Sequence, residues 1–140
     1  MDNISVQTDA KITLGVHEGT VGGVKLVFLH HAEIFPVPYP DQTAENQVRQ
    51  LAVFGKGCLE YFCKRGIIPS VCVTNDWFTG LIPGYAKTGQ FGPTFKGTSF
   101  MHICHNLQES YEGRIFPGPR EGGLEYVHGL PRDVLIDPSW

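Results

Sequence analysis

Two short apolar runs, each ending in polar residues, constrain the fold of this chain more than any other feature. Ser70–Thr74 and Thr98–Cys104 have the composition of interior strands, and the segment between them has the length and spacing of a helix. A strand, a helix and a second strand form a crossover unit, whose strands are parallel in nearly all cases. The sequence therefore predicts an α/β fold in which both strands are buried in a sheet covered on both faces.

The polar residues after these runs predict a site. Asn75, Asp76 and Trp77 follow the first run, and His105 and Asn106 follow the second. The carboxyl ends of parallel strands lie at the same edge of a sheet, and α/β proteins bind ligands in the crevice beyond that edge. We therefore expect the two polar corners to share one rim.

The connecting segment is expected to be a helix of about three turns that begins at Asp76 and stops at Gly89. The Asp76 carboxylate can cap this helix by accepting from the free N–H groups of its first turn. Pro83 removes one internal helix bond and should bend or shorten it.

The upstream half predicts two strands and a long helix. Lys11–Val16 and Gly23–His30 read as strands that can pair, and Thr43–Arg65 has apolar residues on one helical stripe. Gly55 and Gly57 each weaken that helix by about 1 kcal/mol relative to alanine, which predicts close packing against a neighbour. Near the other end, Leu124 to His128 has the pattern of a short helix or strand.

Length, charge and hydropathy exclude several classes of protein. The 140 residues are 41% hydrophobic, which predicts one domain with a workable core. A net charge of -3 without a Lys/Arg cluster argues against a nucleic-acid binder. The chain has no apolar run near the roughly 20 residues that cross a bilayer and no signal sequence after Met1, so we expect a soluble, cytoplasmic protein, with a plastid as the other possible location.

The spacing of the four cysteines matches no familiar metal motif, and we expect reduced, buried thiols: Cys58, Cys63, Cys72 and Cys104. A zinc site from His102, Cys104 and Cys72 is not favoured, because interior strand positions face packed helices and no fourth ligand is evident. Cys104 and His105 point to opposite faces if the strand continues through both, so they cannot form a catalytic dyad.

Several motifs resemble those of one enzyme family. Asn75–Tyr85 and His105–Leu107 are similar to the HDWHTGL-x-P-x-Y and HN-L-x-Y-x-G motifs of bacterial-type glycogen and starch synthases, members of glycosyltransferase family 5. Gly23–Leu29, the pair Pro38-Tyr39, and Asn46 with the run from Leu51 to Phe62 are similar to that family's upstream motifs. The resemblance covers residues 11–117 in matching order, whereas 118–140 are poorly defined.

This resemblance implies that residues 1–140 form part of the N-terminal, Rossmann-like half of a GT-B glycosyltransferase, a parallel sheet with flanking helices. The implied reaction moves glucose from ADP-glucose or UDP-glucose to the 4-hydroxyl of an α-1,4-glucan, with retention of configuration. No metal or other cofactor is implied, because in this fold basic side chains and helix N-termini meet the leaving-group charge. The implied partners are the glucan, the nucleotide-glucose and the remainder of the enzyme.

The resemblance also assigns residues to the site. His105 matches a histidine that contacts the donor sugar through its C6 hydroxyl, and Asp76 matches an aspartate that helps to arrange the sugar pocket; we place both in the catalytic centre. Asn106, Trp77 and Tyr39 are assigned to substrate binding. Trp77 either packs beneath the sugar or fills the interface between helix and sheet. Tyr39 lies in the proline-rich loop Ala32–Asp41, which borders the donor pocket in the family.

Departures from the family pattern qualify the expected activity. Asn75 and Phe78 stand where the family has histidines, and neither a Lys-Thr-Gly-Gly-Leu donor loop nor a second domain is recognisable in the sequence. We therefore expect the isolated 140 residues not to turn over substrate. The alternative is a non-catalytic glucan-binding or interaction module derived from such an enzyme, which the residues at 75 and 78 favour.

Overall fold

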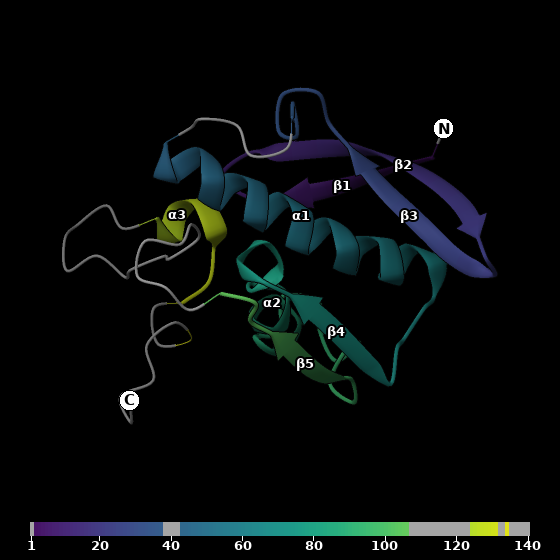
Figure 1. Cartoon of the computed structure of the whole chain (residues 1–140). Coiled ribbons are helices and arrows are strands. Elements are labelled where there is room, and N and C mark those ends of the chain that lie inside the picture. Colours follow the sequence, from purple (N-terminus) through teal and green to yellow (C-terminus); the bar gives the residue numbers. More distant parts are fainter. Residues whose placement is uncertain (1, 38–42, 107–123, 132–133, 135–140) are drawn as a thin grey trace.

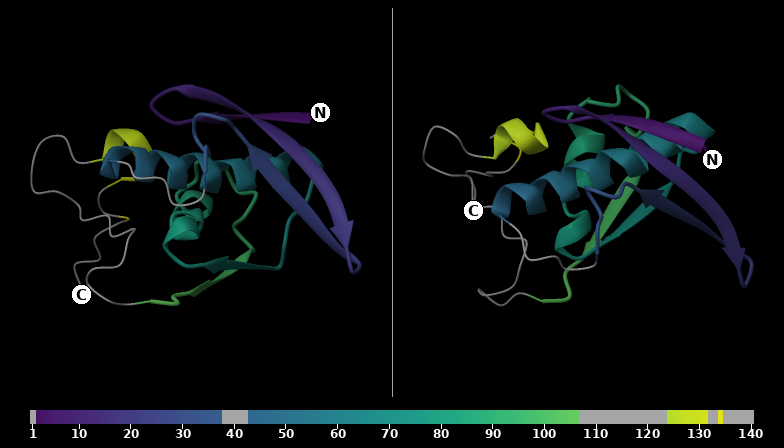
Figure 2. Two further views of the ribbon diagram at one scale, coloured as in Figure 1. Left: turned by 45° about the horizontal axis from the view of Figure 1, so that its top comes forward. Right: turned by 90° about the horizontal axis from the view of Figure 1, so that it is seen from above.

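One long helix lies between two small sheets in the computed structural model, which describes residues 2–37, 43–106, 124–131 and 134 (Figure 1). A three-stranded sheet packs on one side of this helix, and a two-stranded sheet with a short helix packs on the other (Figure 2). The described part of the chain is thus a mixed α/β structure.

The larger sheet is antiparallel and consists of β1 (Asp2–Gln7), β2 (Lys11–Val21) and β3 (Val24–His30) in that order. The predicted pairing of the second and third strands is confirmed, with Val21 opposite Val24 across the Gly22-Gly23 turn. The strand β1 was not predicted, because only two apolar residues alternate in its polar sequence.

The helix α1 spans Ala44–Arg65, and this confirms the predicted range. It begins where the Thr43 hydroxyl accepts from the Asn46 N–H, 3.3 Å away, and it ends at Gly66, which has the left-handed φ of 63° that favours glycine.

The apolar stripe predicted along α1 is present, but the helix buries a second face as well, because it packs against both sheets. Leu51 and Leu59 pack in the core beside the parallel sheet, whereas Val53 and Tyr61 pack against the antiparallel sheet. The two glycines permit this double contact. A β-carbon on Gly55 would lie 3.2 Å from Ile82 Cγ1, and one on Gly57 would lie 2.8 Å from Leu14 Cδ1.

The predicted crossover is present. The strands β4 (Val71–Asn75) and β5 (Ser99–Ile103) are parallel, with Asn75 opposite Ile103. The expected three-turn helix between them is wrong in detail, because the structure has a 3₁₀ turn, η1 (Trp77–Thr79), followed by the short helix α2 (Ile82–Lys87). Pro83 lies in the first turn of α2. Backbone N–H groups in the first turn of a helix have no partner within the helix, so proline is tolerated there.

The expectation that the parallel strands are covered on both faces is also wrong for the described residues. The inner face carries the buried Thr74, but the outer face leaves apolar side chains exposed: Val71 at 58%, Val73 at 47%, Met101 at 52% and Ile103 at 36%. Within the described residues, the parallel sheet consists of two strands, where a larger sheet was predicted.

The structure also tests the expectations for residues 124–128, for the cysteines and for membrane-spanning helices. Glu125–His128 forms the short helix α3, which settles the choice between helix and strand at that position. Burial raises the pKa of the Cys58 thiol to about 12, but Cys63 and Cys104 are exposed, so the expectation of uniformly buried thiols is wrong. Among the described residues, the helices are too short or too polar to span a bilayer.

Candidate functional site

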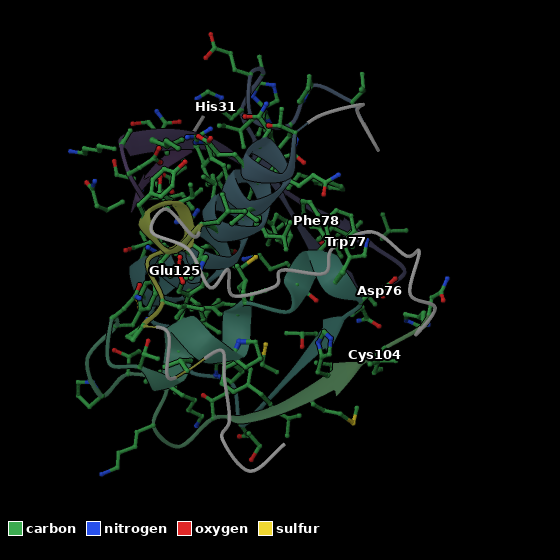
Figure 3. All side chains as sticks on the ribbon, turned by 90° about the vertical axis from the view of Figure 1, so that its left-hand side faces the viewer. His31, Asp76, Trp77, Phe78, Cys104 and Glu125 are labelled. Atoms are coloured by element: carbon green, nitrogen blue, oxygen red, sulfur yellow. The ribbon has the colours of Figure 1, made fainter. Side chains whose placement is uncertain are left out.

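The two polar corners meet at one edge of the parallel sheet, as predicted. The Asp76 backbone N–H donates to the Ile103 carbonyl at 2.8 Å, which extends the β4–β5 ladder past the strand ends. Beyond it, His105 Nε2 lies 3.3 Å from Asn75 Oδ1. Figure 3 shows Asp76 and Cys104 at this edge, with Trp77 and Phe78 on the side toward α1. We call this edge, formed by Asn75, Asp76, His105 and Asn106, the rim.

Asp76 has a strained backbone. Its φ of 57° and ψ of -178° make it the one non-glycine residue with positive φ in the described part of the chain. This region of backbone space is nearly exclusive to glycine and costs other residues on the order of 1–3 kcal/mol. Strain of this kind concentrates at functional sites, where the surrounding structure holds it.

Thr79 holds the strained corner in place. Its hydroxyl donates to the Asn75 carbonyl at 2.7 Å, and its backbone N–H donates to the Asp76 carbonyl at 3.2 Å. The predicted capping role of Asp76 is wrong, because its side chain makes no capping hydrogen bond to η1.

Trp77 and Phe78 are half-buried and belong to an aromatic row that joins the rim to α1. The two rings pack edge to face at 5.4 Å between centroids, and Phe78 contacts Phe54 of α1 at 5.2 Å. Of the two alternatives for Trp77, the structure supports the packing role directly. Phe78, which replaces a family histidine, is likewise an interface residue.

His102 is a polar residue of the site region that sequence reasoning considered only as a zinc ligand. Its Nδ1 lies 2.9 Å from the hydroxyl of Thr74, on the face of β5 opposite the exposed Met101. A β-carbon on Gly80 would lie 3.8 Å from His102 Cε1, so this pair sits directly below the turn that carries Asp76. The alternation of side chains along β5 was the signal that could have placed it there.

Of the two remaining predicted site residues, the structure describes one. Asn106 is half-buried next to His105 on the rim, whereas Tyr39 lies outside the described residues. Within those residues, no three His, Cys, Asp or Glu side chains gather closely enough to hold a metal ion. The rim thus offers an imidazole, amides and a carboxylate, a set of hydrogen-bond donors and acceptors suited to a ligand rich in hydroxyl groups.

Comparison with known proteins gives a consistent result. The sequence profile of the starch synthase catalytic domain matches residues 1–134. The chain is 31% identical to the glycogen synthase of Syntrophotalea carbinolica over 114 residues, which cover 78% of this chain and 23% of that protein. It is 30% identical to the glycogen synthase of Lachnospira eligens over 96 residues, which cover 68% of this chain and 20% of that protein. The chain therefore spans less than a quarter of the length of either relative.

A solved structure shows the same fold. The catalytic domain of Starch Synthase IV from Arabidopsis thaliana, bound to ADP and acarbose, superposes with a TM-score of 0.60 at 19% identity. The match covers 75% of this chain and 22% of that one. This chain thus shares its fold with part of that larger catalytic domain.

Proposed function

This chain belongs to the starch synthase catalytic-domain family, and we propose that it supplies part of the sugar site of a retaining glucosyltransferase. The proposed reaction moves glucose from a nucleotide-glucose, ADP-glucose or UDP-glucose, to the 4-hydroxyl of an α-1,4-glucan. The observation that carries this proposal is the junction at the rim, where the Asp76 corner and the His105 corner are joined by hydrogen bonds.

We assign the roles by the groups that each residue offers. His105 orients the donor glucose through a ring nitrogen, and Asp76 accepts from sugar hydroxyls with a carboxylate held by a rigid, strained turn. Asn106 adds an amide beside His105, and Trp77, whose ring packs against Phe78, is assigned to substrate binding. Tyr39 borders the donor in this proposal.

The larger fold is part of the same proposal. Residues 1–140 would form part of the N-terminal, Rossmann-like half of a GT-B enzyme, in which further strands extend the β4–β5 sheet and further elements cover its apolar outer face. The glycogen synthases that it matches are more than four times as long as the matched region. We expect the 140 residues alone to show no glucan elongation, because donor phosphates are normally bound by groups outside this region.

A chimera tests the proposal. This chain replaces the matching segment of the Syntrophotalea carbinolica glycogen synthase, and incorporation of glucose into glycogen is measured. His105→Ala should lower kcat by about 100-fold, the usual effect of removing one group that stabilises the transition state. His17→Ala, on the far side of α1, is the matched control and should leave turnover unchanged. Unchanged turnover in the His105 variant would remove His105 from the site.

The second candidate is a non-catalytic module that binds glucan. Two observations favour it: Asn75 and Phe78 stand where the family has histidines, and Phe78 is committed to the aromatic row with Phe54. A folded chimera without turnover, together with retardation of this chain in a glycogen-containing gel, would support the module over the enzyme.

A further inference from the structure

Among the described residues, Asn75 makes a side-chain contact with the His105 ring. The side-chain oxygen Oδ1 of Asn75 lies 3.3 Å from His105 Nε2, across the gap between β4 and β5. The sequence placed Asn75 at the predicted rim and marked it as a departure from the family pattern, but it assigned no role to the side chain. Its position shows that it is a neighbour of the candidate catalytic histidine.

The backbone of Asn75 is held from several directions. It pairs with Ile103 in the register of β4 and β5, and its carbonyl accepts from the Thr79 hydroxyl at 2.7 Å. The following N–H, that of Asp76, donates to the Ile103 carbonyl. The backbone that carries the Asn75 side chain is therefore held in place by hydrogen bonds. His105, in contrast, lies in a bend after its strand has ended.

The chemistry of the contact fixes the direction of the hydrogen bond. An amide oxygen can only accept, so an imidazole nitrogen facing it must carry the proton. If Nε2–H donates to Asn75 Oδ1, Nδ1 of the neutral ring is left with a free lone pair. That lone pair can accept a hydrogen bond from a hydroxyl group.

We infer that Asn75 is a positioning residue, which holds the His105 ring in place with Nε2–H turned toward the protein and Nδ1 presented as an acceptor to a hydroxyl-bearing ligand. The choice of ligand class rests on the proposed function, whereas the contact itself does not. A histidine at position 75 could donate or accept according to its own tautomer. Asparagine presents an oxygen to the ring without losing or gaining a proton.

The test uses nuclear magnetic resonance of the isotopically labelled 140-residue chain at pH 8. Long-range ¹H–¹⁵N spectra report which nitrogen of each histidine carries the proton, and ¹³C relaxation reports the order of each ring. We expect His105 to be protonated at Nε2 and to be as ordered as His102, which is bonded to Thr74. Asn75→Ala should lower the order of the His105 ring to that of the exposed His17.

Two further variants separate positioning from general loosening of the site. Asn75→Asp restores an oxygen acceptor and should restore the order of the His105 ring. Thr74→Val removes the hydroxyl that faces His102 and should loosen His102 while leaving His105 unchanged. Protonation of His105 at Nδ1, or a ring whose order does not respond to Asn75→Ala, would overturn the inference.

This experiment is independent of glucosyl transfer. An inactive chimera would overturn the proposed function while the ring measurement still stands, and a failed ring measurement would leave the turnover result intact. The two failures can therefore be distinguished.

Discussion

The antiparallel sheet and the parallel sheet lie on opposite sides of α1 and use their apolar residues differently (Figure 2). In the antiparallel sheet, Ile4, Val6, Leu14 and Val16 all face α1 and are at most 5% exposed. In the parallel sheet, Val71, Val73 and Met101 face away from α1 and are about half exposed or more. The outer face of the antiparallel sheet also leaves apolar side chains exposed, with Val24 at 61% and Phe28 at 58%, so the two sheets differ in their inner faces and in the rim. We call the antiparallel sheet, with its buried aliphatic inner face, the support sheet; the parallel sheet carries the strained polar rim.

We therefore expect the antiparallel sheet to contribute mainly to stability and the rim of the parallel sheet to contribute mainly to function. The support side carries regular pairing and ion pairs such as that between Arg49 and Asp9, 2.7 Å apart. The rim side carries the positive φ of Asp76 and exposed hydrogen-bonding groups. Substitutions on the two sides should therefore have opposite kinds of effect.

The largest effect is expected from Leu14→Ala in the support sheet. Leu14 is fully buried, and removing a buried leucine side chain costs about 2–5 kcal/mol through lost transfer energy and the cavity left behind. Urea denaturation followed by circular dichroism measures the change in the free energy of unfolding. A loss below about 1 kcal/mol would show that this sheet is not the main source of stability.

A gain in stability is expected from Asp76→Gly on the rim. Glycine adopts the Asp76 backbone conformation without strain, so unfolding should become harder by about 1–3 kcal/mol. Asp76→Ala is the matched control, because alanine keeps the strain and loses only the carboxylate. Equal melting temperatures for the glycine and alanine variants would contradict a strained turn.

Acidification should loosen α3 before it affects the ion pairs of the support side. Burial lowers the pKa of His128 below its ordinary 6.5, with nearby Glu125 raising it and Lys56 lowering it to smaller extents. In addition, His128 Nδ1 accepts from the Leu130 N–H at 3.0 Å. The unfolded chain therefore takes up the proton first, and the stability that neutral His128 contributes is present above pH 6.5 and is lost as the pH falls below it.

The Asp9–Arg49 ion pair beside the antiparallel sheet should lose its contribution to stability only at lower pH. The hydrogen bond and charge of Arg49 hold the pKa of Asp9 below its ordinary 3.8, so this contribution persists until the pH falls below that value. Amide hydrogen exchange at pH 7 and pH 5 shows whether α3 loses protection before β1 and β2 do. Protection in α3 should fall at pH 5 while protection in β1 and β2 is kept, and His128→Gln should abolish the pH dependence in α3.

The smallest effect is expected from Val73→Ala on the outer face of the parallel sheet. Val73 is 47% exposed, and substitutions at such positions usually change stability by about 0.5 kcal/mol or less. The same urea titration that serves for Leu14→Ala measures it. A cost comparable with that of Leu14→Ala would mean that this face is covered in solution.

The sequence predicted elements whose signal is local. The extent of α1 follows from apolar spacing between Thr43 and Gly66, and the parallel pair follows from two apolar runs separated by a helix length. The rim followed from a general property of parallel sheets. The roles of Asp76, His105, Asn106, Trp77 and Tyr39 in sugar binding stay predictions.

The errors arise where tertiary contacts decide the outcome. The backbone of Asp76 is set by the closure of the ladder onto Ile103 and by Thr79, and no local pattern reports such a closure. The second buried face of α1 was missed because Val53 and Tyr61 meet strands that are distant in the sequence. Apolar strands suggested cover on both faces, but composition does not say which elements provide that cover.

The central claim is that the two polar corners act together as one side of a sugar pocket. Titration of the chimeric glycogen synthase, isotopically labelled in the segment that this chain supplies, with ADP-glucose, followed by resonance shifts, tests it most directly. We predict that signals of Asn75 and Asp76 shift along the same binding curve as those of His105 and Asn106, while β1 and β2 stay unchanged. Shifts at one corner alone, or shifts confined to the support sheet, would contradict the account.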